Sequence, residues 1–125
     1  MPEKLAQRIT SGSFSACKII SGLCSENEEL KSGALFVDDE LNIQSICTYE
    51  TKVYDLPITT ILAELRRTGS TGIIVFAVVR DQDFTLDEGF AHKLLASCEA
   101  VQTTLLDLLL YSPTGWTSLR QKNLL

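Results

Sequence analysis

The side chains best suited to metal or acid–base chemistry gather in one short stretch of the sequence. Asp81, Asp83, Asp87 and Glu88 supply carboxylates, and His92 is the only histidine of the chain. Glu88 and His92 are four residues apart, so a helix would present both on one face. Such a set could hold a metal ion. The same residues also suit an exposed loop followed by a helix N-terminus, where the helix dipole favours acidic side chains, and this is the simpler interpretation.

The other residues that could act as nucleophiles lack the partners that catalysis needs. The chain has four cysteines, Cys17, Cys24, Cys47 and Cys98, but no CxxC pair and no zinc-finger spacing. We interpret them as small buried apolar side chains. No GxSxG motif is present, and the glycine-containing segment 68–72 precedes a predicted strand, whereas a phosphate-binding loop precedes a helix. These residues predict neither a catalytic nucleophile nor a phosphate site.

Size and charge narrow the possible functions. The 125 residues amount to one domain, and 45% of them are hydrophobic, which is enough for a core without disulfides. The net charge of −5 argues against nucleic acids and anionic membrane surfaces as partners, since both require a basic face. No long apolar run follows Met1-Pro2-Glu3-Lys4, so we expect no secretory signal, and the longest apolar stretches, 72–79 and 105–111, are too short to span a bilayer. We therefore expect a cytoplasmic protein.

Hydrophobic periodicity predicts one α/β domain over residues 13–125, behind an N-terminal extension of residues 1–12. The segment 73–79 is continuously apolar and rich in β-branched residues, which is typical of a central strand buried on both faces. Helices that separate strands imply a mixed sheet flanked by helices. The predicted elements are a helix over 14–24, a hairpin of 34–37 with 42–50, a helix over 57–68, the strand over 73–79, a helix over 85–101, and strands over 103–111 and 116–119.

Two arginines lie in the last turn of the helix predicted over 57–68. Arg66 and Arg67 are favoured there by the helix dipole, and Gly69 suits the left-handed residue that commonly ends a helix. The two cations could bind an anionic ligand. A solvated helix end is the simpler interpretation of the same residues.

Several segments resemble a known family in their order and spacing. An apolar strand begins at Ile73 and is followed by Asp83-Phe84-Thr85, a helix, a second apolar strand over 105–110, and the ending S-L-R-Q-K-N-L-L over 118–125. This succession resembles the RadC branch of the JAMM/MPN domain family. Upstream, Leu35-Phe36-Val37-Asp38 is similar to the family's first strand and turn. The resemblance implies a single MPN-like (cytidine-deaminase-like) domain over residues 13–125 and an association with DNA repair.

The resemblance also locates the family's zinc site on this chain. The family binds zinc through two histidines two residues apart at a strand end and through an aspartate on the next helix, and zinc hydrolysis needs three such ligands and an open position for water. Aligning Asp83-Phe84-Thr85 with the family's D-P-T places Ala77 and Val79 at the histidines and Phe90 at the aspartate. None of these three side chains can coordinate a metal.

Other positions of the family's motif differ as well. Arg80 falls on the motif proline, where its charge would repel a cation, and Asp87 falls on the motif serine. The family's proton-handling glutamate falls near Cys47 or Thr48, although a two-residue change of alignment would place Glu50 there. Because the chain has one histidine, no register supplies a histidine pair. Without bound zinc, nothing lowers the pKa of an attacking water toward neutrality.

The resemblance therefore implies a catalytically inactive domain without metal or cofactor, which acts as an interaction or regulatory module with a protein partner or as a homodimer. Two alternatives remain open. The first is a small-ligand sensor that uses the vacated zinc pocket, lined by Ala77, Val79 and Phe90. The second is an enzyme that holds a non-standard metal with the acidic loop Asp81-Asp83-Asp87-Glu88.

Overall fold

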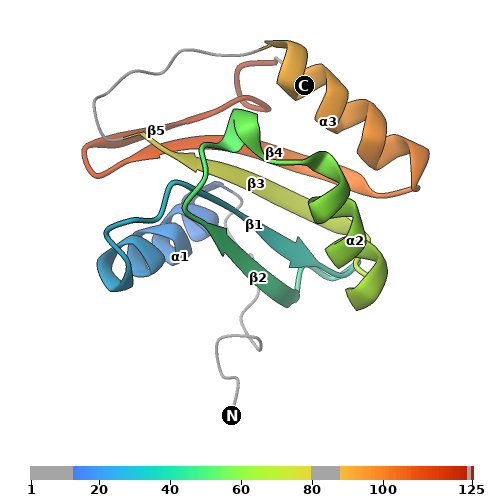
Figure 1. Ribbon diagram of the computed structural model, residues 1–125, viewed down its shortest axis with the longest axis horizontal. Coiled ribbons are helices and arrows are strands. Elements are labelled where there is room, and N and C mark those ends of the chain that lie inside the picture. The colour runs from blue at the N-terminus through green and yellow to red at the C-terminus, as the bar shows by residue number, and fades with distance from the viewer. Residues whose placement is uncertain (1–12, 80–87, 124) are drawn as a thin grey trace.

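The computed structural model describes residues 13–79, 88–123 and 125 of the chain (Figure 1). The predicted N-terminal extension, residues 1–12, lies outside this part. The predicted helices and strands are present within it, with ends that differ by a few residues, and a short 3-10 helix, η2, is added. In order they are α1 (Ser13–Glu26), β1 (Ser32–Val37), β2 (Ile43–Tyr49), η2 (Val53–Asp55), α2 (Ile58–Thr68), β3 (Gly72–Val78), α3 (Glu88–Ala100), β4 (Thr104–Ser112) and β5 (Gly115–Ser118).

The strands of the described residues form one mixed sheet in the order β2-β1-β3-β4-β5. Strand β1 is antiparallel to both of its neighbours, β3 and β4 are parallel, and β4 and β5 form an antiparallel hairpin. A parallel pair requires a long crossover, which contains α3 here. The predicted α/β class, with a mixed sheet flanked by helices, is confirmed.

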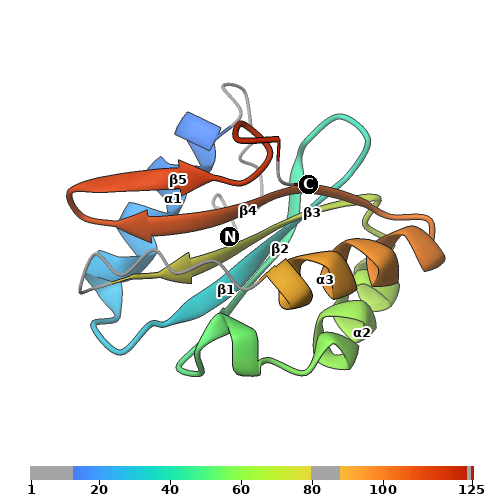
Figure 2. The same ribbon diagram turned by 90° about the horizontal axis from the view of Figure 1, so that it is seen from above.

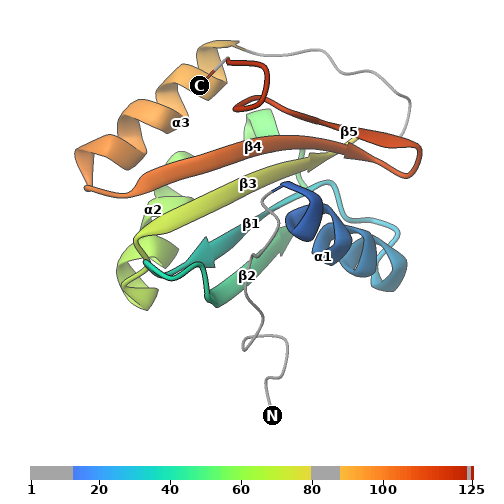
Figure 3. The same cartoon turned by 180° about the vertical axis from the view of Figure 1, so that it is seen from behind.

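Helices cover both faces of this sheet. Helix α1 lies on one face, and α2 and α3 lie on the other (Figure 1, Figure 3). The cluster of buried apolar residues beneath α2 and α3, here named the α2/α3 core, includes Phe36, Ile73 and Leu108. A second cluster, the α1 core, includes Ile20 and Leu35. None of the helices in the part of the chain that the structure describes is long and apolar enough to cross a membrane.

Strand β3 lies at the centre of the sheet and contributes side chains to both cores. All of its residues except the last are buried, as its unbroken apolar sequence predicts. Because side chains alternate along a strand, Ile73, Val75 and Ala77 enter the α2/α3 core, whereas Ile74 and Phe76 enter the α1 core. The alternation places Ala77, near the end of β3, on the face that α2 and α3 cover.

Helix α2 ends at Thr68, as the sequence predicts, and begins at Ile58, one residue later than predicted. Pro57 precedes it with an extended backbone, and Gly69 ends it with a left-handed φ of 65° and donates its N–H to the carbonyl oxygen of Leu65. Glycine adopts this conformation without the steric cost that a Cβ atom adds. Ile61 and Leu65 are buried, so the apolar face of α2 packs on the sheet.

Candidate functional site

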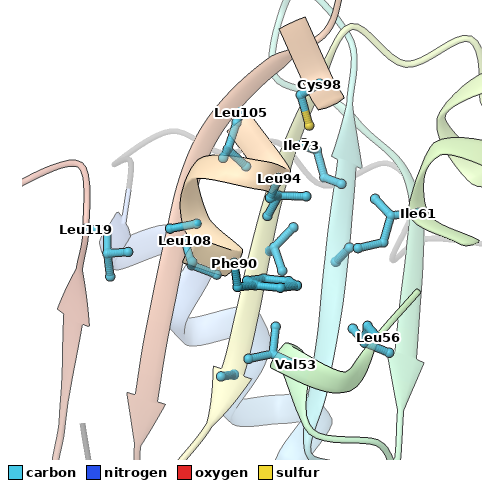
Figure 4. Close-up of a cluster of buried hydrophobic side chains, with 14 of the residues drawn as sticks. Val53, Leu56, Ile61, Ile73, Phe90, Leu94, Cys98, Leu105, Leu108 and Leu119 are labelled. Atoms are coloured by element: carbon cyan, nitrogen blue, oxygen red, sulfur yellow. The ribbon is translucent and has the colours of Figure 1, made fainter. Parts of the chain in front are cut away.

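The three positions that the resemblance assigns to zinc ligands contribute to one apolar region. Ala77, near the end of β3, and Phe90, in the first turn of α3, belong to the α2/α3 core and are 7% and 8% exposed. Val79, just after β3, is partly buried against the same core. In Figure 4 the ring of Phe90 lies within the cluster, with Leu94 above it and Val53 below it. The side chains at these three positions therefore pack as apolar groups in or against the α2/α3 core.

An aromatic contact holds Phe90 from another element. The ring centroids of Tyr54 and Phe90 are 5.3 Å apart and the ring planes meet at 68°, which is an edge-to-face arrangement. Such a pair contributes about 0.5–1.5 kcal/mol beyond the area that it buries. Tyr54 belongs to η2, and its neighbour Val53 is buried in the α2/α3 core. The η2 turn therefore packs against the start of α3.

Strand β2 brings a thiol to the same region. Cys47 and Tyr49 are half-buried against the α2/α3 core, whereas Thr48 and Glu50 are exposed. Of the three positions suggested for the family's glutamate, Cys47 is the one that packs against this core. Burial, with a further contribution from Glu64, raises the pKa of the Cys47 thiol above its usual value. The thiol is therefore protonated at neutral pH, which makes it a weak nucleophile and a weak metal ligand.

The cysteines differ in burial. All four lie among the described residues, and none forms a disulfide. Cys17 and Cys98 are buried, and burial is the main cause that raises the pKa of each thiol to about 11. Cys24 and Cys47 are only half-buried. The prediction that the cysteines are small buried apolar side chains is confirmed at the first two positions and wrong at the other two.

The acidic loop is only partly within the described residues. Asp81, Asp83 and Asp87 lie outside them, so the cluster that they would form stays a prediction. Glu88 begins α3, and His92 follows one turn later, with both side chains exposed. Within residues 13–79, 88–123 and 125, no group of three or more His, Cys, Asp or Glu side chains is placed to hold a metal ion.

A polar network joins the outermost strand β2 to helix α2. The Ser45 hydroxyl donates to Glu64 Oε2 at 2.5 Å, and the Arg67 guanidinium donates to both carboxylate oxygens of Glu64 at 2.7 and 2.6 Å. These bonds, that from Arg67 first, lower the pKa of Glu64 to about 2. Arg67, one of the two arginines interpreted as a solvated helix end, is therefore paired with a carboxylate of its own helix.

The other arginine has a different environment. Arg66 lines a groove of about 650 Å³ between α2 and the turn that joins α3 to β4. The walls of the groove include Leu62 and Ala63 from α2, and Val101 and Gln102 from the turn. None of the three zinc-ligand positions lines it. The structure therefore separates two adjacent cations that the sequence alone treats as equivalent.

Asp107 is the one acidic side chain that is buried in the described part of the chain, and no sequence motif marks it. It lies in β4 where the register between β3 and β4 shifts by one residue. Its carboxylate accepts hydrogen bonds from the Ser118 hydroxyl, from the Leu108 N–H at 2.8 Å and from the Arg120 N–H at 3.1 Å. Several donors therefore compensate for the burial of this charge.

Residues 118–120, which belong to the C-terminal segment of the resemblance, pack against β4 where its register with β3 shifts. The Arg120 guanidinium donates to the carbonyl oxygen of Leu105 at 2.5 Å and to that of Leu106. Leu119 is buried in the α2/α3 core. Ser118, Leu119 and Arg120 thus fasten the end of the chain to β4, which is a structural role.

The chain was also compared with known proteins. No protein-family model matches it, and no curated protein matches it either. The resemblance to the RadC branch accordingly rests on the segments quoted above and on their spacing.

Proposed function

We propose that the chain is a catalytically inactive RadC-like domain of the JAMM/MPN family that serves as an interaction or regulatory module. The order of its elements supports this proposal, because a hairpin, a helix, a central strand, a crossover helix and a last hairpin follow one another around one mixed sheet. The MPN-like (cytidine-deaminase-like) identity of this sheet is part of the same proposal.

One observation carries the proposal of inactivity. Ala77, Val79 and Phe90, at the positions of the three metal ligands, all contribute to the α2/α3 core. Their side chains have no atom that can donate an electron pair to zinc, and zinc hydrolysis needs three ligands and an open position for water. Replacement of all three by apolar groups favours a dry, filled interior over an empty metal site.

Binding is the role left to such a domain. We propose a protein partner, which is either a different chain or a second copy of this one. The net charge of −5 disfavours direct contact with nucleic acid. The association with DNA repair that the resemblance implies would then act through a protein contact.

The two alternatives make different physical demands. A sensor in the vacated zinc pocket needs space beside Ala77 and Phe90, yet both are more than nine-tenths buried among apolar neighbours. An enzyme that uses the acidic loop Asp81-Asp83-Asp87-Glu88 needs a metal ion there. Metal content therefore separates the enzyme from the inactive module.

Metal analysis by mass spectrometry tests the proposal on protein purified without chelators. We expect transition-metal content far below one ion per chain. A stoichiometric metal would overturn the inactive module. In that case Asp83→Asn combined with Asp87→Asn removes the metal if the acidic loop holds it, whereas Asp39→Asn, which alters an exposed carboxylate between β1 and β2, leaves it bound. Light scattering over a range of concentrations then decides between a homodimer and a monomer that needs another partner.

A further inference from the structure

The groove between α2 and the α3–β4 turn has the dimensions of a small-molecule site. Helices α2 and α3 lie side by side on one face of the sheet (Figure 2), and the groove lies beside the end of α3 with a volume of about 650 Å³. Ligand sites commonly measure about 300–1,000 Å³ and combine apolar walls with a few polar groups. Leu62, Ala63 and Val101 supply apolar wall here, and Val101 is 41% exposed.

The charge of the groove is opposite to that of the whole chain. Arg66 is the only charged side chain among the described residues that line it, whereas the chain carries a net charge of −5. Arg67, its neighbour, is paired with Glu64 at 2.6 Å. A guanidinium binds carboxylate-like groups with paired hydrogen bonds and is weakly hydrated, which suits it to a partly apolar site.

The backbone of Gln102 supplies a second observation. Its φ is 59°, in the left-handed region, and it lies two residues after Ala100, the last residue of α3. Glycine is the usual residue in this conformation, as at Gly69 after α2. A non-glycine residue there carries a backbone cost, and such costs are commonly retained where the side chain has a use. The side chain of Gln102 lines the groove, where its amide can donate to an anion.

We propose that this groove binds a small amphipathic anion, with an apolar body against Leu62, Ala63 and Val101 and an acidic head on Arg66 and Gln102. The ligand class is a monoanionic organic acid, such as a carboxylate on an aryl or alkyl body. This site does not depend on the absence of zinc chemistry proposed above, because its lining shares no residue with the three ligand positions.

Two fluorescent probes with the same apolar body test the proposal on the full chain. Anilinonaphthalene sulfonate carries one negative charge, and phenylnaphthylamine is neutral. We expect Arg66→Gln to raise the Kd of the sulfonate about tenfold, as the loss of one charge-assisted contact implies, and to leave the Kd of the neutral probe unchanged. Lys93→Gln removes an exposed cation of α3 outside the groove and should leave both values unchanged. Equal effects of the two variants on the sulfonate would overturn the proposal.

A second variant tests the place of binding. Ala63 is exposed on α2 and lines the groove, so Ala63→Trp should fill the groove and abolish the binding of both probes. Ala96→Trp adds the same side chain at an exposed position of α3 outside the groove and should leave binding intact. Undiminished binding to a folded Ala63→Trp protein, verified by circular dichroism, would overturn the proposal. If Ala63→Trp does not fold, the comparison of Arg66→Gln with Lys93→Gln decides.

Discussion

Two regions of the molecule carry different parts of the family resemblance, and their chemistry is opposite. Around Phe90, where the family would bind zinc, every position aligned with a metal ligand is apolar and contributes to the α2/α3 core. Around Asp107, the S-L-R segment is held by charge-assisted hydrogen bonds to a buried carboxylate. The region aligned with a metal site is apolar, as the sequence predicts, whereas the segment that ends the sheet surrounds a buried carboxylate.

The difference teaches that fold and chemistry are specified by separate residues in this chain. Ser118 and Arg120 determine how the last strand and the chain end pack on β4, so they serve the architecture whether or not a metal is present. Ala77 and Phe90 pack in the α2/α3 core, at the positions that the resemblance aligns with metal ligands. Under the proposed function, the chain would have kept the residues that build the fold and replaced those that perform the reaction.

The largest expected effect comes from removing the side chain at the centre of the dry region. Phe90→Ala deletes a buried ring and its contact with Tyr54, and we expect the free energy of unfolding to fall by about 3–4 kcal/mol. Chemical denaturation measures this loss. Phe14→Ala, which removes a ring that is 59% exposed on α1, should change stability by about 0.5 kcal/mol or less. Similar losses in both variants would show that Phe90 is not part of a packed core.

An intermediate effect is expected in the polar region. Asp107→Ala leaves the hydroxyl of Ser118 and the N–H groups of Leu108 and Arg120 without their acceptor, which should cost about 2–3 kcal/mol. Ser118→Ala should cost about 1 kcal/mol. Because the two residues share a hydrogen bond, the double variant should lose less than the sum of the single losses, by about 1 kcal/mol. Strictly additive losses in chemical denaturation would contradict the direct contact.

The smallest expected effect on stability comes from the ion pair between Glu64 and Arg67 on α2. This pair is polar, like the surroundings of Asp107, but it lies at the surface. The folded pKa of Glu64 is about 2, below the unfolded value of about 4.3. The unfolded chain thus binds more protons between these values, so this contribution to stability is complete above about pH 4.3 and is lost as the pH falls toward 2. Melting temperatures of the wild type should therefore decline more steeply over this range than those of Glu64→Gln. Parallel declines would argue that Glu64 and Arg67 do not interact in solution.

Local signals made much of the fold predictable. The apolar run of β3 predicted a doubly buried strand, and Gly69 predicted the left-handed end of α2. Phe90, Leu94 and Cys98 recur every four residues, as one face of a helix requires, and all three are buried in α3. Each of these signals lies within a single element and depends on period or backbone conformation alone.

Features that depend on how elements meet were not predictable. The partners of Asp107 lie on the next strand and beyond, and their approach depends on a register shift that no local pattern marks. The difference between Arg66 and Arg67 depends on which side of α2 faces the end of α3. Cys47 is half-exposed on β2, and only the order of the strands shows that β2 lies at an edge of the sheet. The resemblance assigned Ala77, Val79 and Phe90 to one pocket, and the structure shows that all three contribute to the α2/α3 core.

The central position of β3 has a consequence for the order of folding events. Strands β1 and β2 are joined by a short turn, as are β4 and β5, so each hairpin can close over a short loop. Strand β3 instead pairs with β1, from which β2, η2 and α2 separate it in the sequence, and with β4, from which α3 separates it. The entropic cost of closing a loop grows with the length of chain that the loop encloses. Such non-local pairings slow folding. We therefore expect the two hairpins to form early and the docking of β3 between them to limit the rate at which either core becomes dry.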